Sequence, residues 1–62
     1  MKVRDIIDLL TEYGWIQVSQ KGSHRQFKHT LKQGRVTVPG KLSDDLKLNV
    51  LKSIFKQAGI KQ

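Results

Sequence analysis

The chain has 62 residues and no cysteine, and its twelve Lys and Arg against five Asp and Glu give a formal net charge of +7 at pH 7. A domain this short buries only about 60% of the surface that its unfolded chain exposes, which leaves no room for a deep substrate cavity or a cofactor-binding fold. The lack of cysteine excludes disulfides and thiolate metal sites. We therefore expect one domain over residues 1–62, no cofactor, and any site on a face or in a loop.

The positive charge favours polyanionic partners, with nucleic acid first, an acidic protein second and an anionic membrane third. The alternative is that excess lysine only keeps a small protein soluble. Residues 1–10 carry charges inside their apolar run, unlike a secretory signal. No stretch approaches the roughly 18 apolar residues of a membrane span. We expect a soluble, cytoplasmic protein that does not associate with membranes.

The first predicted element is an amphipathic helix over residues 3–13. Its apolar residues recur at helical spacing on one side, and they are Val3, Ile6, Ile7, Leu10 and Tyr13. Gly14 follows, at a position where helices commonly end in the left-handed conformation.

Three short strands are predicted next, over residues 15–20, 23–30 and 34–38. In the first, Ile16 and Val18 alternate with polar residues. Lys21-Gly22 and residues 31–34 supply the turns. Such short turns imply an antiparallel meander, because parallel strands need long crossover connections.

Pro39-Gly40 ends the third strand, and a second helix follows. Its apolar stripe consists of Leu42, Leu46, Val50, Leu51, Ile54, Phe55 and Ala58. Ser43 and Asn49 are rival N-caps, so the helix starts near 43 or near 49, and we favour residues 49–58. Gly59 is the expected C-terminal cap.

The predicted fold is therefore α+β, with the order α-β-β-β-α. The simplest packing lays both helices on one face of a three-stranded antiparallel sheet and leaves the other face open.

The alternation of side chains along a strand separates the two histidines. Phe27 is expected to point toward the helices, and His24, three positions away, toward the open face. His29 shares the parity of Phe27 and is expected on the helix side or at its rim. If Ile16 and Val18 are core residues, the open face comprises Gln17, Ser19, His24, Gln26, Lys28, Arg35 and Thr37. A β-bulge would change this assignment.

Trp15 has the parity of the open face, where it would offer a platform for base stacking. The alternative, which we favour, is that the chain is still leaving the helix at this point and that the indole closes one end of the core.

Most catalytic arrangements do not fit this sequence. Two histidines on opposite faces make a poor metal site. Ser23 and His24 are neighbours in a strand, so their side chains diverge and cannot pair. RNA, however, carries its own nucleophile, the 2′-hydroxyl. One histidine can move the proton near neutral pH, and nearby cations can stabilise charge on the phosphate. The alternative is an inert surface histidine.

An ordered set of motifs resembles the HicA toxins of bacterial toxin–antitoxin systems. The set comprises Gly14-Trp15, Q-x-G-S-H-x-x-F-x-H at residues 20–29, V-T-V-P at residues 36–39, and K-Q-A-G-I at residues 56–60. The resemblance covers nearly the whole chain. This chain departs from the family pattern at two places. Many relatives resemble V-P-x-H after the third strand, where this chain has Lys41 in place of the histidine. At the entry to the last helix many resemble P-G-T, where this chain has Leu48-Asn49-Val50.

The resemblance implies a fold like a double-stranded RNA-binding domain and a bacterial, cytoplasmic toxin that cleaves mRNA. It also implies neutralisation by a HicB-type antitoxin, which we expect to cover the face of His24. In that family the histidine of the G-S-H motif is catalytic, which corresponds to His24, while Gly22 and Ser23 would shape its turn. Candidate phosphate contacts, expected to act without a metal, are Lys21, Arg25, Lys28 and Arg35, of which Arg25 has helix-side parity.

Three hypotheses stay open at this point. The first is an endoribonuclease toxin, the second a non-catalytic RNA-binding module of the same fold, and the third a protein-interaction module whose basic face docks an acidic partner. The third can coexist with the first, because an antitoxin would block the same face.

Overall fold

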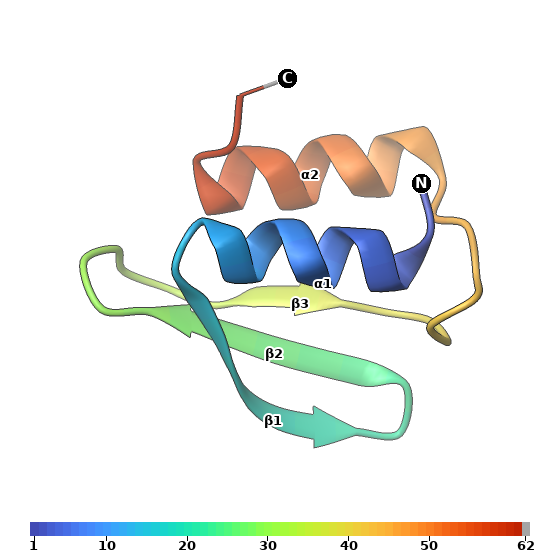
Figure 1. The fold of residues 1–62 in the computed structure, drawn as a ribbon, viewed down its shortest axis with the longest axis horizontal. Helices are drawn as coiled ribbons and strands as arrows, with labels where there is room; N and C mark the ends of the chain where they lie inside the picture. Colours follow the sequence, from blue (N-terminus) through green and yellow to red (C-terminus); the bar gives the residue numbers. More distant parts are fainter. Residues whose placement is uncertain (62) are drawn as a thin grey trace.

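A computed structural model describes residues 1–61 of the chain (Figure 1). The elements are α1 (Val3–Glu12), β1 (Trp15–Lys21), β2 (His24–His29), β3 (Val36–Val38) and α2 (Leu48–Ala58). The strands form one antiparallel sheet in the order β1-β2-β3. Both helices lie on the same side of this sheet (Figure 1), and their buried residues share one hydrophobic core with the strands. The predicted order, the meander and the one-sided packing are confirmed.

Helix α1 packs the predicted stripe against the sheet through Val3, Ile6 and Leu10, which are fully buried. Tyr13 was expected in this stripe, and the structure corrects this, because the helix ends at Glu12 and the tyrosine side chain is exposed. The N-terminus has no side-chain cap. Its first amides instead donate to backbone carbonyls of the segment before α2, Val3 N to Asp44 O at 2.9 Å and Arg4 N to Leu42 O at 3.1 Å. These bonds satisfy donors that a helix start leaves unpaired.

Helix α2 begins at Leu48, which confirms the later of the two predicted starts. The expected caps Ser43 and Asn49 are both wrong, because Lys47 occupies the N-cap position without a side-chain hydrogen bond. Leu42 also leaves the predicted stripe, since it lies in the preceding loop and is exposed.

The C-terminus of α2 ends as predicted, at Gly59 with a φ of +71°. Gly59 N donates to Lys56 O at 3.3 Å and Ile60 N to Phe55 O at 2.9 Å. This pair of bonds is the Schellman motif, in which the residue after the glycine packs back on the last turn. Ile60, which the predicted stripe omitted, is accordingly buried with Phe55.

Strand β1 corrects the predicted face assignment. Trp15 is buried, whereas Ile16 is 59% exposed and Val18 is 48% exposed. The register with β2 shifts between Gln17 and Ser19, so a β-bulge interrupts the alternation at Val18. Figure 1 shows β1 running along the margin of the sheet, away from the helices. After Trp15 this strand is therefore exposed on both sides, and its aliphatic residues do not join the core.

Trp15 closes one end of the core, as favoured from the sequence. Its indole Nε1 donates to Ala58 O, the last residue of α2, at 3.3 Å. The ring also packs edge-on against His29, with centroids 5.2 Å apart. The ring is only 1% exposed, so a base-stacking role for Trp15 is excluded in this fold.

Candidate functional site

The face of the sheet opposite the helices carries the candidate site, and we call it the open face. Strand pairing places Lys21 opposite His24, Ile16 opposite Lys28, and Gln26 between Ser19 and Thr37. Residues directly opposite in a sheet share a face, and Val18 and Ile16 line one pocket with Lys28. The open face therefore comprises Ile16, Val18, Ser19, Lys21, His24, Gln26, Lys28 and Thr37. Gln17, expected here, is wrong, because it pairs with inward-facing Phe27.

Arg35 precedes β3 and adds its guanidinium to this face. Its Nη1 donates to Gln26 Oε1 at 2.6 Å. Since Gln26 lies on the open face, this hydrogen bond holds the Arg35 charge over the centre of the sheet.

His24 is presented by a tight turn at the end of the β1–β2 hairpin. Lys21 and His24 form the last pair of the ladder, and Gly22 and Ser23 are the two loop residues. Gly22 has a φ of +61°, and no non-glycine residue among those described has a positive φ. A two-residue hairpin with glycine first is typical of a type II′ turn. A Cβ at Gly22 would meet nothing within 4 Å, so the turn requires glycine for its conformation and not for space.

The two histidines differ in what their ring nitrogens do. His29 Nδ1 accepts from Leu31 N at 3.0 Å, so the ring proton must lie on Nε2, which donates to Tyr13 O at 3.0 Å. Both nitrogens of His29 are thus used by the fold. The His24 ring is exposed, and within residues 1–61 neither of its nitrogens has a hydrogen-bond partner. Of the two, His24 alone has its nitrogens available to a ligand.

Gly14 completes the structural half of the motif set. A Cβ on Gly14, whose φ is +90°, would lie 2.8 Å from His29 Nε2. The missing side chain therefore lets the imidazole reach the carbonyl oxygen of Tyr13. Gly14, Trp15, Phe27 and His29 hold the hairpin on the helices, and Gly22, Ser23 and His24 are exposed at its far end.

The structure changes the expectation for Arg25, which was a candidate phosphate contact. Its side chain is only 9% exposed. Nη1 donates to Ser23 O at 3.3 Å and to Gly40 O at 2.7 Å. Arg25 therefore joins the turn before His24 to the Pro39-Gly40 turn, and its burial excludes it from the cations that the open face presents.

The acidic residues all lie away from the open face. Asp5, Asp8 and Glu12 lie on α1, and Asp44 and Asp45 lie in the loop before α2, so none of the five acidic residues is in a strand. The charged side chains that reach the open face are Lys21, Lys28 and Arg35, all exposed. An anionic ligand on this face meets attraction without local repulsion.

Sequence-predicted site residues thus fall into three groups. Lys21, Gly22, Ser23 and His24 lie together at the hairpin turn. Lys28 is four residues along β2 from His24, about 13 Å at roughly 3.3 Å per residue. Arg35 lies over the neighbouring strand. Ile16 and Val18 were expected in the core and not on this face, and the only signal in the sequence for their outward direction was the competing parity of Trp15.

Residues 1–61 show neither a cluster of metal ligands nor a membrane-spanning helix. No three His, Cys, Asp or Glu side chains in this part of the chain gather as metal ligands would. Within the same range neither helix has the length and apolar character needed to traverse a bilayer.

The α-β-β-β-α order, with both helices on one face of an antiparallel three-stranded sheet, is that of the double-stranded-RNA-binding-domain-like folds. Within this class, the model of the family described as the HicA toxin of bacterial toxin–antitoxin systems matches residues 3–60. The chain belongs to the HicA toxin family. No curated protein matches it.

Proposed function

We propose that the chain is the RNA-cleaving toxin of a toxin–antitoxin pair and that its substrate is mRNA. One observation carries this proposal: His24, an exposed imidazole without a protein partner among the described residues, lies on a face whose charged side chains are all cationic. Membership in the HicA toxin family supports it. RNA binding to such a face draws on Lys21, Lys28 and Arg35, which release counterions when they contact phosphates.

The proposed reaction uses the nucleophile of the RNA itself. The 2′-hydroxyl oxygen forms a bond to the adjacent phosphorus, the bond from phosphorus to the 5′ oxygen breaks, and that oxygen leaves with a proton. His24 takes the proton from the 2′-hydroxyl or supplies the proton to the leaving oxygen. Lys21 faces His24 across the last pair of the ladder, so its ammonium is placed to stabilise charge on the same phosphate. We propose that no metal takes part.

Gly22 and Ser23 contribute through the shape of the turn. A side chain at Gly22 would be strained at a φ of +61°, and the turn sets the direction in which His24 leaves the strand. We assign these two residues to positioning of the imidazole and to backbone contact with the RNA.

The antitoxin is proposed to act on the same face. Membership in the HicA toxin family implies a HicB-type antitoxin, and a partner with an acidic surface is complementary to Lys21, Lys28 and Arg35. Covering His24 and these cations would prevent RNA from binding.

Expression in a bacterial host tests the proposal. We expect the intact chain to arrest growth and to deplete mRNA, and His24→Ala to do neither at equal protein abundance, because the proton-transfer group is lost. Ser19→Ala, on the same face, is the matched control and should stay toxic. Equal growth arrest by the intact chain and by His24→Ala would contradict a catalytic role for His24. RNA binding without any cleavage by the intact chain would favour a non-catalytic RNA-binding module instead.

A further inference from the structure

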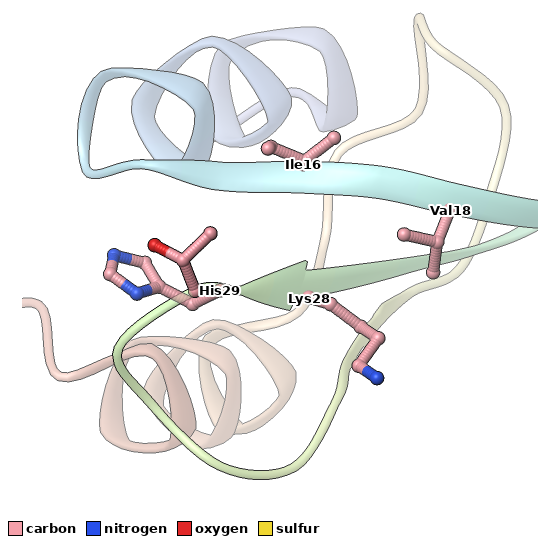
Figure 2. Close-up of a pocket in the computed structure, with 5 residues that line it drawn as sticks. Ile16, Val18, Lys28 and His29 are labelled. Atoms are coloured by element: carbon pink, nitrogen blue, oxygen red, sulfur yellow. The ribbon is translucent and has the colours of Figure 1, made fainter.

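The open face has a second feature, a shallow pocket at the end of the hairpin remote from His24. Its volume is about 310 Å³, and it is lined by Ile16, Val18, Lys28, His29 and Thr30. Figure 2 shows Ile16 and Val18 on β1 and Lys28 on the neighbouring β2. The lining is mostly apolar, which is unexpected on a face otherwise made of polar and cationic side chains.

The two aliphatic residues have no role in the core. Ile16 and Val18 remain 59% and 48% exposed. Ile16 pairs with Lys28 on the open face, and Val18, two residues further along β1, lines the same pocket. Exposed apolar groups that cluster at a pocket commonly mark a binding site. The fold therefore leaves a small apolar surface beside one cation, on the same strand pair as His24.

We infer that this pocket is a nucleobase subsite, in which an unstacked base of the RNA packs on Ile16 and Val18 while Lys28 contacts its phosphate. The inference rests on the proposed function. An unpaired base offers a flat apolar face attached to an anionic backbone. The pocket offers the complementary pair, an aliphatic surface and an ammonium, in a volume of about 310 Å³.

The distance of the pocket from His24 indicates what a bound base would do. Lys28 and His24 lie on the same face of β2, about 13 Å apart by strand geometry. A base held at the pocket would be a few nucleotides from the phosphate at His24. It would fix the register of the strand on the sheet, so that the reacting phosphate meets the imidazole more often than by charge alone.

Binding of a short single-stranded RNA by the double variant Ile16→Thr/Val18→Thr tests the subsite. Threonine keeps the β-branched shape that suits strands and removes apolar surface at two exposed positions, so the fold is retained. We expect the dissociation constant to rise about five- to tenfold. Its dependence on salt should stay unchanged, because no phosphate contact is lost. Lys28→Gln should instead make the slope of log K against log[salt] shallower by about 0.7.

Two companion variants sharpen the test. Leu31→Thr removes equivalent apolar surface from a loop residue that is 88% exposed and outside the pocket, and it should bind RNA like the intact chain. Val18→Tyr adds an aromatic face and should tighten RNA binding, again without a change in salt dependence.

The subsite is overturned if the intact chain binds and cleaves RNA and the double threonine variant binds it equally well. It is also overturned if that variant loses affinity only for the antitoxin, since the pocket would then serve a protein partner. In both cases the proposed function stands. If the intact chain neither binds nor cleaves RNA, the proposed function fails, and the subsite fails with it.

Discussion

His24 and His29 lie on the same strand but differ in what surrounds their rings. His29 packs against Trp15, and both of its ring nitrogens form hydrogen bonds with backbone groups. His24 extends from the last ladder pair into solvent. The separation of three positions between His24 and Phe27, an odd number, was sufficient to predict this difference, because alternation within β2 is undisturbed. The prediction succeeded for β2 since both buried residues, Arg25 and Phe27, share one parity.

At the residue scale, Gly14→Ala tests the close approach of His29. Alanine at a φ of +90° pays about 1–2 kcal/mol for the left-handed conformation. The new Cβ also displaces His29 Nε2, which loses its bond to Tyr13 O at a further cost of about 1 kcal/mol. Urea unfolding measures the sum.

Gly34→Ala is the matched control for that substitution. Gly34 has a φ of +84°, close to that of Gly14, but a Cβ there would meet nothing within 4 Å. It should therefore show the conformational cost alone. Equal losses of unfolding free energy in the two variants would mean that the His29 contact contributes nothing to stability.

At the scale of elements, β1 is where prediction from sequence failed. Ile16 and Val18 offered one apolar parity and Trp15 the other. The structure buries Trp15, which is larger and finds a hydrogen-bond acceptor at the end of α2. The bulge at Val18 then turns Ser19 onto the open face, opposite Gln26. The prediction for Ser19 is therefore correct, but because of the bulge and not because of regular alternation. A β-bulge depends on the register between two strands, and the hydrophobic pattern of one strand does not reveal that register.

The buried faces and C-termini of the two helices were predictable from the sequence, and their N-termini were not. Their buried stripes and their terminal glycines are local signals, and both were read correctly in most positions. Their N-termini were not, because neither uses a capping side chain. The first amides of α1 instead donate to the carbonyls of residues 42 and 44, which lie 38 and 41 positions away along the chain, and a local sequence pattern does not reveal such partners.

At the scale of elements, Arg25 joins the hairpin turn to the Pro39-Gly40 turn, and its contribution to stability can be tested. Arg25→Met should reduce the free energy of unfolding by about 1–3 kcal/mol, because the guanidinium hydrogen bonds to Ser23 O and Gly40 O are lost. Chemical denaturation measures this loss. The salt dependence of RNA binding should stay as in the intact chain, whereas Lys28→Gln reduces it. A shallower salt slope for Arg25→Met would return Arg25 to the phosphate contacts.

At the scale of the whole molecule, the open face differs from the rest of the surface in carrying cations and no acidic residue. The helices cover one face of the sheet and carry or adjoin the acidic residues, while Lys21, Lys28 and Arg35 gather on the other face. In so small a chain the three strands contribute to both the core and the site. Core and candidate-site residues therefore alternate along the strand: Phe27 and His29 lie on one side of β2, and His24 and Lys28 lie on the other.

The most direct test of the account is single-turnover cleavage of a defined RNA by the purified intact chain and by His24→Gln, in buffer containing EDTA. Glutamine keeps a polar group that cannot exchange protons near neutral pH. RNA affinity, measured in parallel, should be nearly the same for both proteins, because the cations that bind phosphate are untouched. We expect the intact chain to cleave the RNA and His24→Gln to cleave it more slowly by about 100-fold or more. Cleavage by His24→Gln at a rate close to that of the intact chain would contradict a catalytic role for His24.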